Sequence, residues 1–209
     1  MKNILKISSR NLLRYKRRSF LSSLLIIFGI VFIFLFIGIV SSFKSTVIEE
    51  MTGTQLGHFQ IHKKNYLKAI STLPLEYDIT TEESDTLARK LSKNKNIEAF
   101  TRRIIFNGLL SNYNQSTSSR IIAVDPIDEI KTCPNVKKRI SGFKVNKKLI
   151  SRGEIIFPKS IAEPMKIKKG SNIVLVATNK NGSINAINLK VVGFFDSPMR
   201  IGYIHIEDA

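Results

Sequence analysis

The chain has 209 residues and a mass of 23.7 kDa, which is enough for one ordinary domain with an appendage and too short for two large domains. It carries 33 Lys and Arg against 16 Asp and Glu, for a formal net charge of +17. Hydrophobic residues make up 43%, which excludes a disordered polybasic chain. The single cysteine, Cys133, excludes a disulfide-stapled fold and a cysteine-based zinc cluster.

The first 43 residues divide into a basic segment and an apolar segment. Residues 1–18 hold seven basic residues and no acid, whereas residues 19–43 hold no charge at all. From Phe20 to Val40 every residue except two serines and two glycines is Phe, Leu, Ile or Val. As a helix this stretch is about 31 Å long, which matches a hydrocarbon core of about 30 Å. We therefore predict a transmembrane helix over residues 19–43, with the ends of the span at Phe20 and Val40.

Two other interpretations of this segment are disfavoured. A buried core helix of a soluble protein would not be this long and apolar on every face. A cleaved signal peptide would have an apolar region of only about 7–15 residues, and Val40-Ser41-Ser42 is a weak cleavage site. The sequence therefore favours an uncleaved anchor.

The charges before the span predict its orientation. Basic residues are retained on the cytoplasmic side, so Arg14, Lys16, Arg17 and Arg18 determine a topology with the N-terminus in the cytoplasm. Residues from about 44 onward are then extracytoplasmic, and the protein belongs in the cell (inner) membrane. Residues 1–18 also suit an amphipathic helix on the inner leaflet, although a plain positive-inside tail explains the same charges.

The rest of the chain predicts one α+β domain on a helical stalk. We expect residues 44–55 to continue the helix as the stalk until Gly53 and Gly57, and residues 56–209 to form a mixed, mostly antiparallel domain. Strands are expected over 57–67, 97–110 and 119–125. Thr80 and Thr81, followed by Glu83, predict a capping box that begins a helix over 81–94. Asp125 is expected to cap a short helix with Pro126 at its first position.

The last fifty residues predict one short helix and three strands. Ser160 is expected to cap a helix that runs to Met165, and Gly170-Ser171 to end it before a strand over 172–178. Asn181-Gly182 predicts a two-residue hairpin turn to a returning strand over 187–195. A final strand is expected over 203–209.

Residues that could carry chemistry are sparse. The sequence has no phosphate-binding G-x-x-x-x-G-K-[ST] and no serine-hydrolase elbow. On a strand His58 and His62 would share a face, but no cysteine or well-placed carboxylate completes a metal site, so surface histidines are favoured. The carboxylates of Glu82, Glu83 and Asp85 fit a helix first turn, and those of Asp125, Asp128 and Glu129 fit turns and caps. Cys133 has no recognisable activating partner. We therefore expect no enzyme, no metal and no cofactor.

The excess of positive charge does not predict nucleic-acid binding. Seven of the charges are explained by membrane topology, and the others are single or in short clusters without a zinc finger or aromatic RNA-binding signature. An extracytoplasmic location favours attraction to membrane lipid or to an acidic protein face over nucleic-acid binding. A basic surface that is simply solvated is favoured over both.

Several phrases, in order, give the chain a family resemblance. The opening SSRNLLRYKRRSFLSSLLIIFGI resembles that of ABC-transporter permeases of the MacB/FtsX-like superfamily. GHFQIHKKNY and IIAVDPIDE resemble phrases of lipoprotein-releasing (LolC/LolE-type) permeases, with Ala123 where glycine is usual. EIIFPKSIAEPMKIKKGSNIVLV resembles their helix–turn–strand passage, with Ser171 in place of the common acid, and LKVVGFFDS with YIHIEDA resembles the closing strand pair.

The resemblance implies a permease subunit with a MacB-like periplasmic core domain between its first span and three later ones. Such permeases pair as homo- or heterodimers, associate with a separate ATP-binding subunit and transmit ATP-driven motion across the membrane. In the lipoprotein-releasing branch the cargo is a lipoprotein that passes to a periplasmic carrier.

The chain departs from this family in length, because it ends at Ala209 before the three later spans. We expect either an N-terminal fragment or split reading frame, with an incomplete domain, or a partner polypeptide that supplies the rest. Because a single helix cannot enclose a pathway, the chain alone should not transport anything. Two alternatives stay open: a single-pass extracytoplasmic scaffold or adaptor without an ATPase, and a membrane-anchored enzyme, which the missing catalytic set disfavours.

Overall fold

The computed structural model describes residue 10, residues 14–197 and residues 199–209, and it divides into two compact units, Met1–Glu49 and Glu50–Ala209. The proposed amphipathic helix over residues 1–18 lies mostly outside the described residues. The first unit consists of helix α2 (Lys16–Met51), whose last two residues belong to the second unit.

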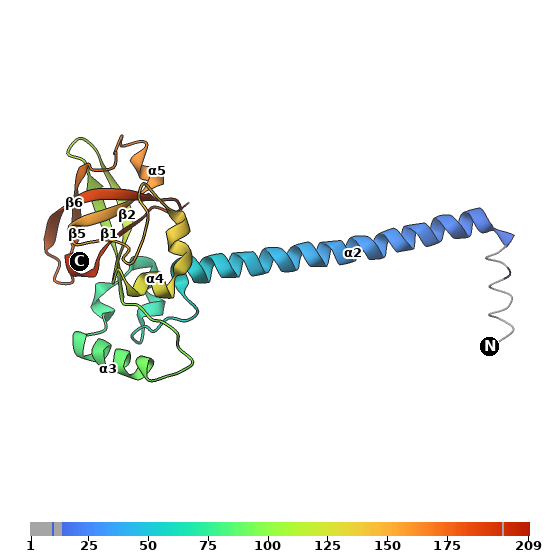
Figure 1. Ribbon diagram of the computed structural model, residues 1–209, viewed down its shortest axis with the longest axis horizontal. Helices are drawn as coiled ribbons and strands as arrows, with labels where there is room; N and C mark the ends of the chain where they lie inside the picture. The colour runs from blue at the N-terminus through green and yellow to red at the C-terminus, as the bar shows by residue number, and fades with distance from the viewer. Residues whose placement is uncertain (1–9, 11–13, 198) are drawn as a thin grey trace. The chain divides into compact units, whose positions relative to one another are not determined.

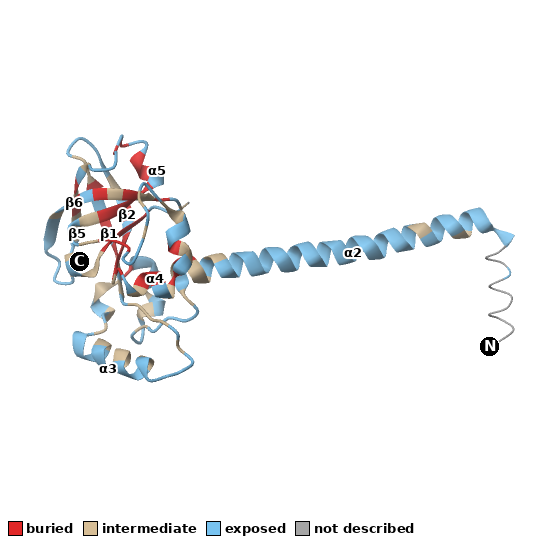
Figure 2. Cartoon of the chain, viewed as in Figure 1, coloured by how far each residue is buried: buried red, intermediate tan, exposed pale blue. Residues whose placement is uncertain are grey.

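Helix α2 is apolar over its whole circumference. None of its residues is buried, and its Phe, Leu, Ile and Val side chains, apart from the half-buried Leu24, are exposed along its length (Figure 2). A soluble helix cannot leave so much apolar surface in water, because each exposed large side chain forgoes burial free energy. Within the described part of the chain, it is the one helix long and apolar enough to cross a membrane, as judged by length and composition.

The second unit is built on one seven-stranded sheet. Its strands are β1 (Arg103–Ser111), β2 (Ser116–Val124), β3 (Ile140–Ser141), β4 (Glu154–Pro158), β5 (Asn172–Thr178), β6 (Ile184–Phe195) and β7 (Ile201–His205). They lie in the order β3-β6-β4-β7-β2-β1-β5, and β6 also pairs with β5. The long strand β6 therefore closes the sheet, because its first half pairs with β5 and its second half with β4.

Most strand pairs are antiparallel. The exceptions are β2 with β7 and β4 with β6, which are parallel. The helices of the second unit are α3 (Thr81–Ser92), α4 (Asp128–Thr132) and α5 (Lys159–Ala162), and a 3-10 helix, η5 (Pro134–Arg139), follows α4 (Figure 1). One long apolar helix followed by a mixed domain with a mostly antiparallel sheet confirms the predicted α+β class.

The core occupies both faces of the sheet, because side chains alternate along each strand. In β2, Ile121 and Ala123 join a cluster on one face, while Ile122 and Val124 join a cluster on the other. The first cluster also includes Phe157, Leu189 and the α5 residue Ile161. The second lies under α4, η5 and the segment after them, and it includes Cys133, Val136, Leu149 and Tyr203.

Several sequence predictions for this unit are confirmed. Thr80 caps α3 in a full capping box with Glu83. Strands occupy most of 97–110, 119–125, 172–178 and 187–195. Asp125 does act at the start of α4, because its Oδ1 accepts hydrogen bonds from the backbone of Ile127 and Asp128, although the helix begins at Asp128 rather than at Pro126.

Four predictions are wrong. Residues 57–67 form no strand; they are an irregular segment that enters a short 3-10 helix. Ser160 lies inside α5, which follows Pro158 and ends at Ala162. The hairpin loop spans five residues, 179–183, because the Asn179 side chain accepts from the backbone of both Asn181 and Ser183. The last strand ends at His205, since a 3-10 helix occupies Ile206–Asp208.

Candidate functional site

The segment Glu50–Gly57, where α2 ends and the second unit begins, is held by other parts of that unit at several points. We call this segment and its contacts the stalk junction. After Met51 the chain makes a π-helical turn, Thr52–Leu56, and Gly57 ends it with φ +65°, a conformation that glycine adopts without strain. The turn packs against η5: a Cβ on Gly53 would lie 2.5 Å from Nδ2 of Asn135, and Thr54 is buried.

At the centre of the stalk junction, Arg103 at the start of β1 pairs with Glu129 of α4. Nε of Arg103 donates to Oε2 of Glu129 at 2.9 Å, and Nη2 donates to Oε1 at 2.6 Å. The Glu129 side chain is fully buried and that of Arg103 is 14% exposed. A bidentate guanidinium–carboxylate pair is among the strongest polar contacts, and its fixed geometry locks the positions of both groups.

The same guanidinium also binds the stalk. Nη1 of Arg103 donates to the backbone oxygen of Gln55, and Nη2 donates to Sγ of Cys133 at 3.0 Å. The Cys133 thiol in turn lies 3.7 Å from the backbone oxygen of Thr52, to which it donates. Arg103 therefore joins three parts of the fold that are far apart in sequence: the stalk, strand β1 and helix α4.

Burial and charge set the ionisation of this cluster. Burial lowers the pKa of Arg103, but the Glu129 carboxylate opposes this and raises the pKa above its ordinary value, so the guanidinium stays charged. Burial raises the pKa of Glu129, and Arg103 opposes the shift. Burial also raises the pKa of the Cys133 thiol and of the neighbouring Tyr203 hydroxyl. The cluster is thus one buried ion pair among neutral groups.

A second, more exposed ion pair lies at the rim of the stalk junction. Nε of Arg139, the last residue of η5, donates to Oε1 of Glu50 at 2.8 Å, and Nη2 lies 2.7 Å from the same oxygen. Thr54 donates its hydroxyl to the backbone oxygen of Glu50 and, at 3.1 Å, to Oε1. The hydrogen bond from Arg139 is the main reason that the pKa of Glu50 is lowered. The last turn of α2 is thus fixed at its side as well as at its end.

A large open groove, of about 1930 Å³, adjoins the stalk junction, because Leu56, Gly57 and Arg103 are among its lining residues. Its lining comes from the irregular segment after Gly57, from α3 and from strands β1, β5 and β6, and includes Phe59, Leu91, Ile104 and Ile187. No residue of α3 is buried, although Leu87 and Leu91 of this helix face the groove (Figure 2). The groove is therefore a surface on which an apolar ligand or segment could lie.

Among the residues that the structure describes, no group of three or more His, Cys, Asp and Glu could hold a metal. His58 is exposed, and His62 stacks on Tyr66 with ring centroids 4.6 Å apart and hydrogen-bonds Oε1 of Gln60. What the contacts of the stalk junction do is join elements: Arg103 links Gln55 to β1, and Arg139 links Glu50 at the end of α2 to η5.

The predicted topology residues lie on or beside α2. Arg14, Lys16, Arg17 and Arg18 are exposed at its start, where the Arg14 guanidinium lies 5.9 Å from the Tyr15 ring centroid. Phe20 and Val40 lie within the helix and are exposed. These residues are not brought into a common site with one another, and their role in orientation stays a prediction.

The residues of the stalk junction were missed by the sequence analysis. Glu129 was assigned to a turn or cap and is instead a fully buried ion-pair partner, while Cys133 does have a close cationic neighbour. The available signal was the spacing of Glu129 and Cys133, four residues apart around Ile130, which places them on one face of a short helix. Nothing in the sequence pairs that face with Arg103.

Comparison with protein families gives one match. The family described as the MacB-like periplasmic core domain matches residues 19–207, which is nearly the whole chain. No curated protein is similar enough in sequence to count as a match.

Two solved structures resemble the fold weakly. The periplasmic region of MacB from Actinobacillus actinomycetemcomitans is 14% identical with a TM-score of 0.40, and the match covers 59% of this chain and 55% of that one. The extracellular domain of the noncanonic ABC-type transporter YknZ from Gram-positive bacteria is 12% identical with a TM-score of 0.42, covering 57% and 60%. The chain thus spans little more than half the length of these structures.

Proposed function

From the premise that this chain belongs to the family of MacB-like periplasmic core domains, we propose that it is a permease component of an ABC transporter. In this proposal α2 anchors the chain in the inner membrane, and Glu50–Ala209 works on the extracytoplasmic side. A separate subunit binds and hydrolyses ATP, because this chain has no phosphate-binding motif. A second permease subunit completes the membrane part.

The observation that carries the proposal is the double attachment of the stalk. Motion that reaches the end of α2 acts on the sheet through Arg103 and on η5 through Arg139. The buried pair of Arg103 with Glu129 makes the inner attachment stiff, whereas the exposed pair of Arg139 with Glu50 is the weaker one. Such a junction passes a displacement of the helix into the domain instead of absorbing it in a flexible linker.

The orientation of the anchor is part of the same proposal. Arg14, Lys16, Arg17 and Arg18 retain the N-terminus in the cytoplasm, the span runs from Phe20 to Val40, and the domain lies outside. A protease added to spheroplasts should then cleave the domain without lysis. Reversing the four charges to Glu should reduce this cleavage, because the positive-inside bias would be lost.

The finer proposal concerns the cargo, which we take to be a lipoprotein handed on to a periplasmic carrier. Its support is the resemblance of residues 57–66 and 121–129 to phrases of lipoprotein-releasing permeases. The open groove beside α3, with its apolar lining, offers a place for an apolar segment of such a cargo or carrier. Depletion of the protein should then leave lipoproteins in the inner-membrane fraction.

The experiment that tests the function is purification of the tagged chain from its native membrane, followed by labelling with a photoreactive ATP analogue. We expect a separate polypeptide to be labelled and to co-purify in a fixed ratio, while the chain itself stays unlabelled. If no ATP-binding polypeptide co-purifies, the proposal is wrong and a single-pass scaffold without an ATPase becomes the better interpretation.

Coupling through the stalk junction is tested in the purified complex by hydrogen exchange. Addition of ATP should change the exchange of backbone amides in β1 and η5, and the double variant Glu50→Gln/Arg139→Gln should weaken the change in η5. The matched control is Arg152→Gln/Glu207→Gln, which removes a surface pair away from the stalk. Equal effects of the two double variants would contradict a role for the rim pair.

A further inference from the structure

One segment of the second unit is strongly and uniformly basic. Residues 130–153 contain eight Lys and Arg and no Asp or Glu. Three of the eight make ion pairs with acids from other segments or from α4: Lys131 with Asp128, Arg139 with Glu50 and Arg152 with Glu207. The other five have no ion pair among the described residues and are all exposed; we call them the basic face: Lys137, Lys138, Lys144, Lys147 and Lys148.

The basic face is held in place by the packing of its own segment. The apolar residues that alternate with the lysines point inward: Val136, Leu149 and Ile150 are buried, and Phe143 and Val145 pack on the same core cluster. The backbone N–H of Leu149 also donates to the oxygen of Pro126 at 2.9 Å. The lysines are therefore carried on a packed segment with its apolar side chains turned inward, and not on a free tail.

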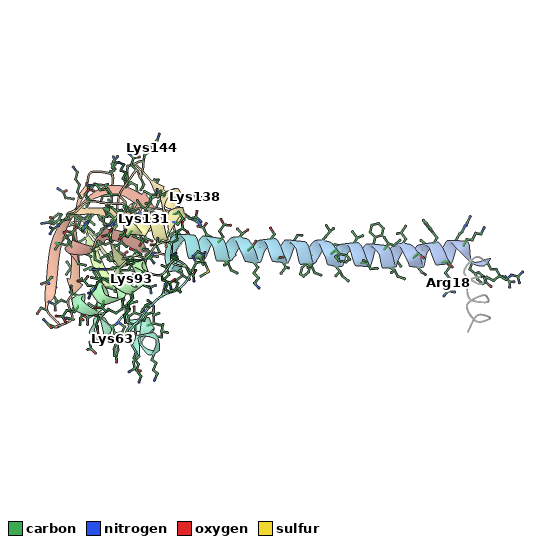
Figure 3. All side chains as sticks on the ribbon, turned by 60° about the horizontal axis from the view of Figure 1, so that its bottom comes forward. Arg18, Lys63, Lys93, Lys131, Lys138 and Lys144 are labelled. Atoms are coloured by element: carbon green, nitrogen blue, oxygen red, sulfur yellow. The ribbon has the colours of Figure 1, made fainter. Side chains whose placement is uncertain are left out.

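The position of the basic face follows from the stalk junction. Arg139, directly after Lys137 and Lys138, pairs with Glu50 in the last turn of α2, and η5 packs against the π-helical turn that follows. In Figure 3 the labelled Lys131, Lys138 and Lys144 lie in the upper part of the domain, whereas Lys63 and Lys93 lie in the lower part. Lys137 and Lys138 thus lie beside the point at which the stalk enters the domain, and Lys144, Lys147 and Lys148 follow in the same packed segment.

Chain length limits how far this point can be from the bilayer. Val40 and Glu50 are both in α2, so about ten residues of helix separate the end of the apolar stretch from the rim pair, or roughly 15 Å at about 1.5 Å per residue. The headgroup layer takes up about 5–7 Å of this distance. What remains is about one Debye length at physiological ionic strength, a distance at which surface charges still attract one another.

We propose that the basic face binds the anionic phospholipid headgroups of the leaflet on the domain's side of the membrane. Four of the five exposed lysines have no counter-charge among the described residues, and Lys138 shares that of Glu50 with Arg139. Exposed lysines on a segment that begins about one Debye length from the headgroups match what anionic lipid attracts. An acidic protein face would fit the charge alone, but nothing fixes it near the stalk, whereas the membrane is fixed there by α2. The inference rests on the membrane anchor in the proposed function and not on the ATP-binding partner.

The test uses the full chain in lipid nanodiscs and measures acetylation of each lysine by mass spectrometry. We expect the basic face to react at least about threefold more slowly in discs with one third anionic phosphatidylglycerol than in purely zwitterionic discs. High salt should remove this protection, because it screens the charges. Lys93, together with the exposed Lys64, Lys68 and Lys95, serves as the internal control and should react equally in both discs.

A variant supplies the second measurement. A fluorophore at Asn146→Cys, with acceptor-labelled lipid in the disc, should transfer energy more efficiently in anionic discs. The variant Lys137→Gln/Lys138→Gln/Lys147→Gln/Lys148→Gln should lose this increase, whereas Lys64→Gln/Lys68→Gln/Lys93→Gln/Lys95→Gln, which removes the same charge elsewhere, should keep it.

Equal acetylation in both kinds of disc would overturn the inference, as would protection that extends to the control lysines or that requires an added acidic protein. Membrane insertion of α2 is tested separately, by whether the chain enters the disc and resists extraction at alkaline pH. A chain that enters the disc without protection of the basic face defeats this inference and leaves the proposed function in place.

Discussion

Arg103 and Glu129 are 26 residues apart in the chain, yet their side chains meet in two hydrogen bonds at the buried centre of the stalk junction. The first residue of β1 is thereby fixed to the second residue of α4, and the guanidinium still has a donor left for the backbone oxygen of Gln55. Because a buried charge is costly without its partner, each of the two residues depends on the other.

Removal of Glu129 should therefore be strongly destabilising. We expect Glu129→Ala to lower the free energy of unfolding by about 3–5 kcal/mol, because it leaves the Arg103 charge buried and unpaired. The double variant Arg103→Met/Glu129→Leu should cost much less than the sum of the single changes. Chemical denaturation in detergent, followed by tyrosine fluorescence, measures these differences.

The neighbouring Asp128 gives the matched control for this prediction. It pairs with Lys131 at 3.1 Å, but both side chains are exposed, so Asp128→Ala should cost less than about 1 kcal/mol. If Glu129→Ala costs no more than Asp128→Ala, the buried pair is not what holds the stalk junction together.

The thiol of Cys133 should be protected in the folded chain. It is fully buried and burial raises its pKa, so at neutral pH it is neither accessible nor ionised, and the thiolate is the reactive form. We expect the native chain to resist N-ethylmaleimide and to react stoichiometrically once it is unfolded in denaturant. Because this is the sole cysteine, the mass shift of the intact chain reports it directly. Rapid labelling of the native chain would show that the stalk junction opens.

Local signals in the sequence predicted the local structure well. The apolar stretch from Phe20, the capping box at Thr80 and the short apolar run of β5 after Gly170-Ser171 are each local in sequence, so they can be interpreted without knowing the fold. The prediction of a strand after Gly57 was wrong because it, too, used only local sequence. Its alternating His, Phe, Gln and Ile fit a strand, but a strand needs a partner, and in the structure this segment lines the groove instead.

The stalk junction could not be predicted because it depends on sheet topology. Arg103 reaches Glu129 only because β1 pairs with β2, and β2 leads into Asp125 and α4. The parallel pairing of β2 with β7 then places Tyr203 beside them. Sequence alone gave no register for these strands, so a buried carboxylate was indistinguishable from one at an exposed cap.

The capping box should contribute much of the stability of helix α3, which lines the groove. Oγ1 of Thr80 accepts from the backbone of Glu83, and the Glu83 carboxylate accepts from the backbone of Thr80 at 3.0 Å. None of the α3 residues is buried, so packing adds little and the cap matters more. We expect Thr80→Ala to speed hydrogen exchange over Thr81–Ser92 by about fivefold, which corresponds to a cap of about 1 kcal/mol. Thr81→Ala, one residue later, is the control and should leave the exchange nearly unchanged.

The rim pair of Glu50 and Arg139 should make stability depend on pH in the acid range. The hydrogen bond from Arg139 lowers the pKa of Glu50 from its ordinary 4.5, so the folded chain binds this proton less tightly than the unfolded chain does. The contribution of Glu50 is therefore fully present above pH 4.5 and is lost as the pH falls through the lowered pKa. Wild type should be more stable than Glu50→Gln near neutral pH, and the difference should shrink below about pH 4.

The variant Arg139→Gln separates this effect from other acid-sensitive groups. Without the guanidinium the pKa of Glu50 has lost its main cause of lowering, so the effect of Glu50→Gln should then depend much less on pH. Because both side chains are about two-fifths exposed, salt should also reduce the wild-type advantage. The measurement is a set of unfolding curves between pH 3 and pH 7 for wild type, the two single variants and the double variant. If the pH-dependent effect of Glu50→Gln is the same with and without Arg139, another partner of Glu50 causes the pH dependence.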